Sequence, residues 1–432
     1  MTSESGAADP GASEPAGRAT RAGALGRVTV ATAVAAASGY LVLLLAARQL
    51  GASGYAVFAV FWAAYGMVTG AQNGQLQETT RAVRSAAESR RRGAARPLAV
   101  NIGIGVALAG AVAASSPLWA GRVFTVDRGL SVVLLTVGVA SFAVYAYLSG
   151  ALSGSLSWAT FAMLLSVDAL IRLAGALIAV AAGWGVPAFL VVTVAGSASW
   201  CILLLTSATA RRAVGLPVDV DTGRYTAQTV TAMAAAAASA VVVMGFPVLI
   251  RLTGRGDDDA HLVGAVILAV TLTRAPLLVP LNSFQGVLIA RFVAAGRAVG
   301  RALMVPAAIV VTVGGVGAVA AWLIGPWLLE HVFGADFRLG GGTLALFTLG
   351  ATTLAVLTVT GAAAIAVGAH RWYAVGWWAA AAASVALLAL PLDVAERVSV
   401  SLVVGPLAGM VVHLAAIRAR TRAASAAARD IT

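Results

Sequence analysis

The sequence predicts an all-α integral membrane protein with about twelve transmembrane helices. Three observations support this fold class: the chain is strongly apolar, its apolar segments have the length of membrane spans, and its arginines gather in alternate loops. Hydrophobic residues make up 60% of the 432 residues, charged residues make up 11%, and the mean hydropathy is +0.91. A soluble domain carries roughly 25% charged residues, so most of this surface must face lipid.

Each predicted span has about the length that a helix needs to cross roughly 30 Å of hydrocarbon, about 20 residues. The second and eleventh spans are short and are expected to tilt little or to lie partly in the interface. The first is longer than the apolar core of a signal peptide, so we expect a retained anchor, with a cleaved leader as the alternative. The twelve spans are residues 28–47, 55–71, 98–118, 130–152, 159–182, 186–205, 230–250, 262–281, 304–328, 343–367, 372–390 and 398–417.

The placement of arginine orients the bundle. Lysine is absent, and this bias, with the high alanine, valine and glycine content, is typical of a GC-rich bacterial genome. With the N-terminus inside, 20 of the 29 arginines fall on the inner side and 7 on the outer side, as the positive-inside rule requires. We therefore expect a multi-pass protein of the bacterial inner membrane with both termini in the cytoplasm.

The net charge of +12 does not indicate nucleic-acid binding. Six arginines lie between residues 81 and 96, in the loop after the second span, where a topology determinant belongs. Their expected partners are anionic lipid headgroups.

A polar loop divides the spans into two sets of six. We expect a disordered tail at residues 1–27, a first lobe at 28–210, a linker at 211–228, a second lobe at 229–417 and a basic tail at 418–432. The starts of the two halves are faintly alike, which favours an internal duplication of the kind found in transporters.

Ionisable side chains inside spans are costly and normally face a bundle interior. Asp168 and Arg172 are four residues apart in the fifth span and share one helix face. They form either a self-neutralising pair or part of a wet cavity. Arg274, in the eighth span, has no acid within four residues, so its role is either structural or to bind an anionic cargo.

Amide side chains end the second span at Gln72, Asn73 and Gln75, and Arg81 follows. Amides both donate and accept hydrogen bonds, which suits sugar hydroxyls. The alternative is an ordinary polar helix end at the interface.

The sequence lacks the usual marks of catalysis. Cys201 is the single cysteine, so no disulfide forms within the chain, and the four histidines are too scattered to suggest a metal site. No glycine-rich phosphate loop follows a strand. We therefore predict no cofactor, no metal and no enzyme activity.

Three segments resemble a known family. The runs ARQLGASGYAVF at residues 47–58, QETTR at 77–81, and GPW at 325–327 with FG at 333–334 are similar to polysaccharide-export flippases. These flippases belong to the multidrug/oligosaccharidyl-lipid/polysaccharide exporter superfamily. The resemblance implies two six-helix lobes in a V-shaped alternating-access transporter that flips a lipid-linked (isoprenoid-pyrophosphate) oligosaccharide outward.

In that interpretation Arg274, Arg172 and Arg81 attract the pyrophosphate, and Gln72, Asn73 and Gln75 contact the sugar. Asp168 balances charge or couples protons. The partners would be the saccharide cargo, anionic lipids and polysaccharide-assembly enzymes. Three alternatives stay open: a membrane polymerase or ligase, a non-transporting envelope scaffold, and a drug exporter of the same superfamily.

Overall fold

The computed structural model describes residues 14–90, 92–254 and 258–429. Helices cover nearly all of this part of the chain, and it contains no strand. Ten of its helices are long and apolar enough to cross a membrane. The chain is therefore an all-helical multi-pass membrane protein, as predicted.

The first two predicted spans lie in one helical hairpin, α1 (Glu14–Ser89), which reverses at Gly51. Gly51 has φ 66°, a left-handed conformation that glycine adopts without strain. We call residues 14–50 the first arm and residues 52–89 the second arm. The helix begins inside the predicted N-terminal tail, and residues 1–13 lie outside the described residues.

The remaining helices of the first half each correspond to one predicted span, except that the sixth span is broken. They are α2 (Pro97–Val123), α3 (Arg128–Gly154), α4 (Trp158–Ala181), α5 (Val186–Ala195), the 3₁₀ turn η1 (Gly196–Ala198) and α6 (Ser199–Thr206). The short helix α7 (Ala208–Val214) follows and extends into the predicted linker.

The second half repeats this plan with a broken first span. Its elements are α8 (Thr222–Val243), α9 (Phe246–Leu252), α10 (Ala260–Ala295), η2 (Gly296–Ala298), α11 (Val299–Phe333), η3 (Ala335–Phe337), α12 (Gly341–Ala366), α13 (His370–Leu388) and α14 (Val394–Arg429). Asp221 and Asp259 cap α8 and α10 by accepting hydrogen bonds from Arg224 N and His261 N.

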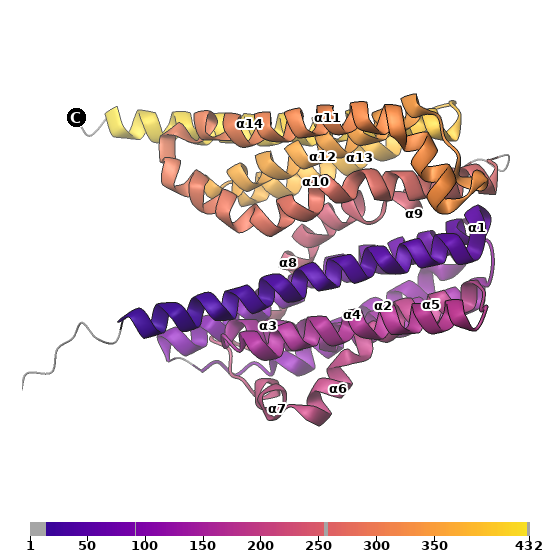
Figure 1. The fold of residues 1–432 in the computed structure, drawn as a ribbon. Helices are drawn as coiled ribbons and strands as arrows, with labels where there is room; N and C mark the ends of the chain where they lie inside the picture. Colours follow the sequence, from indigo (N-terminus) through magenta and orange to yellow (C-terminus); the bar gives the residue numbers. More distant parts are fainter. Residues whose placement is uncertain (1–13, 91, 255–257, 430–432) are drawn as a thin grey trace, which may run out of the picture.

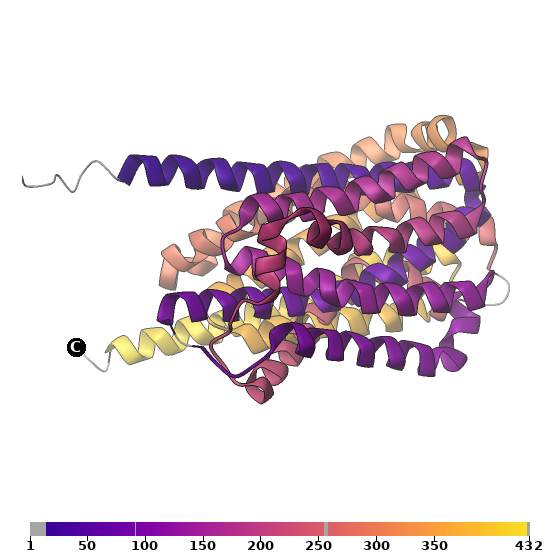
Figure 2. The ribbon, with the colours of Figure 1, turned by 90° about the horizontal axis from the view of Figure 1, so that it is seen from below.

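The helices form two lobes (Figure 1). α1 to α6 make the first lobe, α9 to α14 make the second, and α8 runs obliquely between them. The described ends of α1 and α14 lie at the same end of the bundle in both views (Figures 1 and 2). We call this the termini end and the opposite one the far end. The lobes meet at the far end and diverge toward the termini end.

Candidate functional site

A cavity of about 560 Å³ lies between the two lobes. Its walls come from α1, α3, α4 and α5 of the first lobe and from α8, α10, α12 and α13. It extends from the middle of the bundle toward the termini end, since Ser149 and Phe161 lie within a few residues of the helix ends there. The polar and aromatic side chains in its wall include Trp62, Asn73, Tyr145, Ser149, Asp168, Arg172, Ser239, Gln285, Tyr373 and Trp377.

Glycines at four-residue spacing bring two helices of this wall together. Gly66, Gly70 and Gly74 of the second arm of α1 face α8, where a Cβ on Gly70 would lie 2.7 Å from the Cβ of Ala240. A Cβ on Gly74 would meet the backbone of Met233. Small residues at this spacing allow membrane helices to approach backbone to backbone. The predicted first helix of the second lobe is thus packed closely along the first lobe.

Asp168 and Arg172 form an ion pair in the cavity wall, with 2.9 Å between Oδ1 and Nη2. The predicted sharing of one helix face is confirmed. The guanidinium carbon lies 5.8 Å from the centroid of the Trp62 ring, within the range of a cation–π contact. Arg172 Nε is buried and has no hydrogen-bond partner among the described residues. This Nε faces Gly196, whereas 19% of the Arg172 side chain stays exposed and gives it access to the cavity.

The break in the sixth span makes room for this pair. A Cβ on Gly196, the first residue of η1, would collide with Arg172 Nε and Asp168 Oδ1. Short 3₁₀ stretches within helices often mark functional sites or strain. Here the irregular turn places bare backbone directly against the charged groups.

Arg274 lies in α10 beside the break between α8 and α9. Its Nη1 donates to the carbonyl oxygens of Val242 and Val243, at 3.3 Å and 3.0 Å, and its guanidinium carbon is 4.9 Å from the Phe246 ring centroid. These carbonyls are among those that a helix end leaves without partners. Arg274 is not among the described residues that line the cavity. Its part in binding cargo remains a prediction.

The predicted amides point in different directions. Asn73 is exposed in the cavity, whereas Gln72 and Gln75 are buried against neighbouring helices. Gln72 Nε2 donates to the Val139 carbonyl at 3.0 Å, and Gln75 Nε2 donates to the Asn101 carbonyl at 3.1 Å. The structure therefore places Asn73, but neither glutamine, in the cavity that the Asp168–Arg172 pair also lines.

Arg81 lies at the termini end and joins the second arm of α1 to the linker. Its Nη2 is 2.6 Å from Glu78 Oε1 and its Nη1 is 3.4 Å from Asp219 Oδ2. Burial alone would raise the pKa of Asp219, but the Ser85 hydroxyl and the Arg81 charge outweigh it, and the pKa lies below its usual value. Gly93 N also donates to the Val218 carbonyl at 2.7 Å. Arg81 thus helps to fasten the linker to the first lobe.

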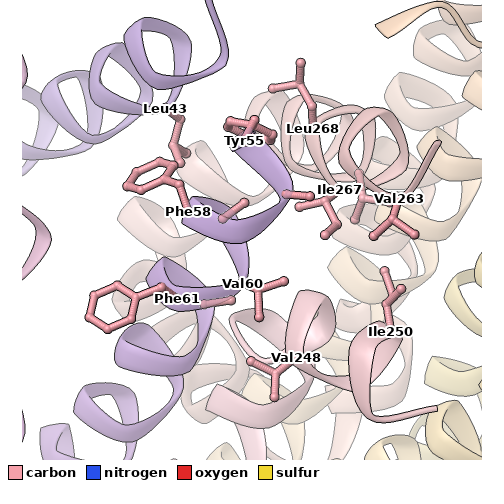
Figure 3. Close-up of a cluster of buried hydrophobic side chains, with 14 of the residues drawn as sticks. Leu43, Tyr55, Phe58, Val60, Phe61, Val248, Ile250, Val263, Ile267 and Leu268 are labelled. Atoms are coloured by element: carbon pink, nitrogen blue, oxygen red, sulfur yellow. The ribbon is translucent and has the colours of Figure 1, made fainter. Parts of the chain in front are cut away.

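A hydrophobic cluster closes the bundle beyond the cavity, and we call it the far-end seal. Tyr55 stacks edge-on against Phe337, with 6.0 Å between ring centroids, so the cluster joins the two lobes. A Cβ on Gly264 would collide with the backbone of Ala52, so α10 presses directly on α1 there. The seal contains Leu43, Tyr55, Phe58, Val60 and Phe61 of α1, Val248 and Ile250 of α9, and Val263, Ile267 and Leu268 of α10 (Figure 3).

The sequence did not single out the second-lobe side of the cavity. Tyr373 and Trp377, four residues apart on α13, line it, together with Ser239 and Gln285. Aromatic residues near span ends normally indicate interfacial anchors. Their four-residue spacing is the signal that could have placed both on one face. Among the described residues, no group of three or more His, Cys, Asp or Glu could hold a metal ion.

The fold is that of known transporters. The chain matches the inward-facing conformation of a multidrug resistance MATE family transporter of the MOP superfamily with a TM-score of 0.67 at 12% identity, covering 91% of this chain and 96% of that one. The outward-facing conformation of a multidrug resistance MATE family transporter matches with a TM-score of 0.59 at 14% identity, covering 93% of this chain and 96% of that one. The class defined by fold and cavity is therefore a multi-pass membrane protein with the transporter fold of the MOP superfamily.

Close relatives occur in mycobacteria, whereas no protein-family model matches the chain. The uncharacterized protein Rv3630 of Mycobacterium tuberculosis is 46% identical over 417 residues, 95% of both chains. The uncharacterized protein Rv1510 of the same species is 46% identical over 400 residues, 92% of both. This chain belongs to the family of these mycobacterial proteins.

Proposed function

We propose that the chain is an alternating-access transporter that flips a lipid-linked, isoprenoid-pyrophosphate oligosaccharide across the inner membrane, with the termini end in the cytoplasm. The fold supports a membrane transporter, and the cavity between the lobes supplies a binding site that can be exposed to each side in turn. In the described state the far-end seal is closed and the cavity lies toward the termini end.

The observation that carries the proposal is Arg172 in the cavity wall. A pyrophosphate taken from water into a membrane cavity needs a fixed positive charge, and guanidinium donates to phosphate oxygens in a fork geometry. Asp168 occupies one side of the guanidinium and neutralises it while no cargo is bound. The cargo anion would compete with this carboxylate for the Arg172 donors.

The rest of the wall suits a saccharide. Asn73 and Gln285 can both donate to and accept from hydroxyl groups, and the rings of Trp62, Tyr373 and Trp377 offer flat apolar faces. A mostly apolar cavity with a few polar groups is the usual form of a specific small-molecule site.

A drug exporter is the second candidate. Asp168 supplies the carboxylate that an organic cation would seek in the same cavity, and the solved neighbours include multidrug resistance transporters. The two candidates differ in the sign of the cargo's charge, so one comparison separates them.

The experiment uses the full-length protein in liposomes with two probes. One is a polyprenyl-pyrophosphate disaccharide with a fluorophore on the sugar, whose movement is followed by quenching from outside. The other is ethidium, an organic cation. We expect the saccharide probe to move. The double variant Arg172→Gln/Asp168→Asn should slow it roughly 10- to 150-fold, which corresponds to the loss of a charge-assisted hydrogen bond.

Arg301→Gln, at an exposed arginine of the termini end, is the matched control and should leave the rate unchanged. Movement of ethidium without movement of the saccharide probe would reject flipping and favour the drug exporter.

A further inference from the structure

His413 is a fully buried imidazole in the second lobe, and the transport site described above does not use it. It lies in α14 between α12 and α13. A Cβ on Gly376 would collide with its ring, and a Cβ on Gly361 would lie 3.4 Å from Cε1. The neighbouring helices α12 and α13 therefore carry glycines where the ring lies, and the space between them fits an imidazole.

The polar contacts of the ring involve both nitrogens. Nε2 is 3.1 Å from the carbonyl oxygen of Tyr373, and Nδ1 is 3.2 Å from Oγ1 of Thr360. The Thr360 hydroxyl also donates to the carbonyl oxygen of Leu357 at 2.9 Å. The Tyr373 phenol is the titratable group that faces the ring, and no ion pair of the described residues involves His413.

Elementary chemistry assigns the protons. A carbonyl only accepts, so Nε2 must carry a proton toward Tyr373. When the single Thr360 proton points to Leu357, the Thr360 oxygen can only accept, so Nδ1 must also carry a proton. Every contact is then satisfied by the imidazolium form. In the neutral ring, the Thr360 hydroxyl must turn from Leu357 and donate to Nδ1 instead.

The site lies just behind the cavity between the lobes. The Tyr373 ring lines that cavity and lies parallel to the imidazole, with 5.9 Å between ring centroids and 3° between the planes. Protonation adds a positive charge one aromatic layer behind the cavity wall. Removal of the proton leaves a neutral, hydrogen-bonded core. Histidine is the side chain whose ordinary charge change falls between pH 5 and 8.

We propose that His413 is a proton-binding site in the second lobe through which a proton gradient drives transport. The coupling part rests on the proposed function. One proton from cavity water binds Nδ1, the Nδ1–H group donates to Thr360 Oγ1, and the Thr360 proton turns to Leu357. Reversal on the other side of the membrane returns the proton to water. Asp168 is not assigned this role, because its carboxylate is already paired with the Arg172 guanidinium.

Proton binding by His413 is tested without any cargo. The full-length protein, labelled with ¹⁵N in its imidazoles, is placed in lipid nanodiscs and its NMR spectrum is recorded from pH 8 to pH 5. His413→Gln assigns the signal, and His370→Gln, at an exposed histidine of α13, is the matched control. We expect His413 to change from one protonated nitrogen to two within this range. The same protonation state throughout would overturn the proposal.

A second variant guards against misfolding of His413→Gln. Thr360→Val keeps the shape of the side chain but removes the oxygen that accepts from Nδ1–H. We expect His413 to keep one protonated nitrogen over the same range in this variant. A change to two protonated nitrogens, as in the wild type, would overturn the proton assignment.

The coupling part uses the saccharide probe in liposomes with a pH difference of one unit. One proton per cycle shifts the final distribution of the probe about tenfold. His413→Gln should abolish this shift, and His370→Gln should retain it. If the wild type moves the probe with no response to the pH difference, coupling is wrong and the proposed function stands. If the wild type does not move the probe, the proposed function fails and coupling fails with it.

Discussion

A backbone contact between the two lobes at the far end offers the sharpest perturbation. Gly264, in the first turns of α10, packs against the backbone of Ala52 in α1. In the change Gly264→Ala the new Cβ would lie 2.8 Å from the carbonyl carbon of Ala52 and closer still to its oxygen. Backbone atoms cannot turn aside as a flexible side chain can. The two lobes must therefore separate locally, or the bundle must remain strained.

The size of the expected effect follows from the free-energy cost of adding a methyl group to a packed site. An extra methyl group in a tightly packed site costs about 1–3 kcal/mol. This penalty applies only in the state in which α10 and α1 touch at the far end. It should therefore shift the equilibrium toward the state open at the far end by roughly 5- to 150-fold.

Spin-label distances measure this shift. In a Cys201→Ser background, one label pair spans the lobes at the far end, at Thr125 and Leu392, and another spans them at the termini end, at Leu156 and His370. Gly264→Ala should lengthen the first distance and shorten the second.

Gly286→Ala is the matched control, because a Cβ at this position of the same helix meets nothing within 4 Å. A folded Gly264→Ala variant with both distances unchanged would refute the far-end contact as the point where the lobes separate.

Two further predictions concern Arg274 and the linker. Arg274→Gln keeps a donor for the carbonyls of Val242 and Val243 and should preserve protein abundance, whereas Arg274→Leu should lose about 1–3 kcal/mol of stability in thermal unfolding. Because the sequence predicts that the Arg274 charge attracts the pyrophosphate, the folded Gln variant should move the probe more slowly. Movement at the wild-type rate would restrict Arg274 to its structural contact. Because the pKa of Asp219 is depressed, its ionised carboxylate stabilises the contact between the linker and the first lobe above about pH 4. This stabilisation is lost as the pH falls further. Hydrogen exchange at the Gly93 amide, corrected for its intrinsic rate, should therefore accelerate below pH 4, and Asp219→Asn should remove this pH dependence, while a flat wild-type profile would contradict the assignment.

The spans were predictable because their signal is length and apolarity, which the bilayer imposes directly. The positions at which helices reverse or break were not predictable from this signal. The first two spans read as separate segments, and only the structure shows that they join in one hairpin at Gly51. The breaks at Gly196 and at Met244–Gly245 likewise lie against Arg172 and Arg274, which are distant in the sequence.

The site was predictable where the partners are near in sequence. Asp168 and Arg172 are four residues apart, so helix geometry alone places them together. The faces of the second arm of α1 were harder to assign. Its cavity side includes Thr69, Asn73 and Leu76, whereas Gln72 and Gln75 lie on another side. In a helix surrounded by apolar groups, periodicity does not separate the cavity face from a packed one.

The central claim is that one cavity is exposed to the two sides of the membrane in turn. The most direct measurement is labelling of Asn73→Cys, in the Cys201→Ser background, with a membrane-impermeant thiol reagent added to one side at a time. We predict reaction from the side of the termini in the unmodified background, and a gain of reaction from the opposite side when Gly264→Ala is added. Labelling that ignores the side of addition, or that Gly264→Ala leaves unchanged, would contradict alternating access.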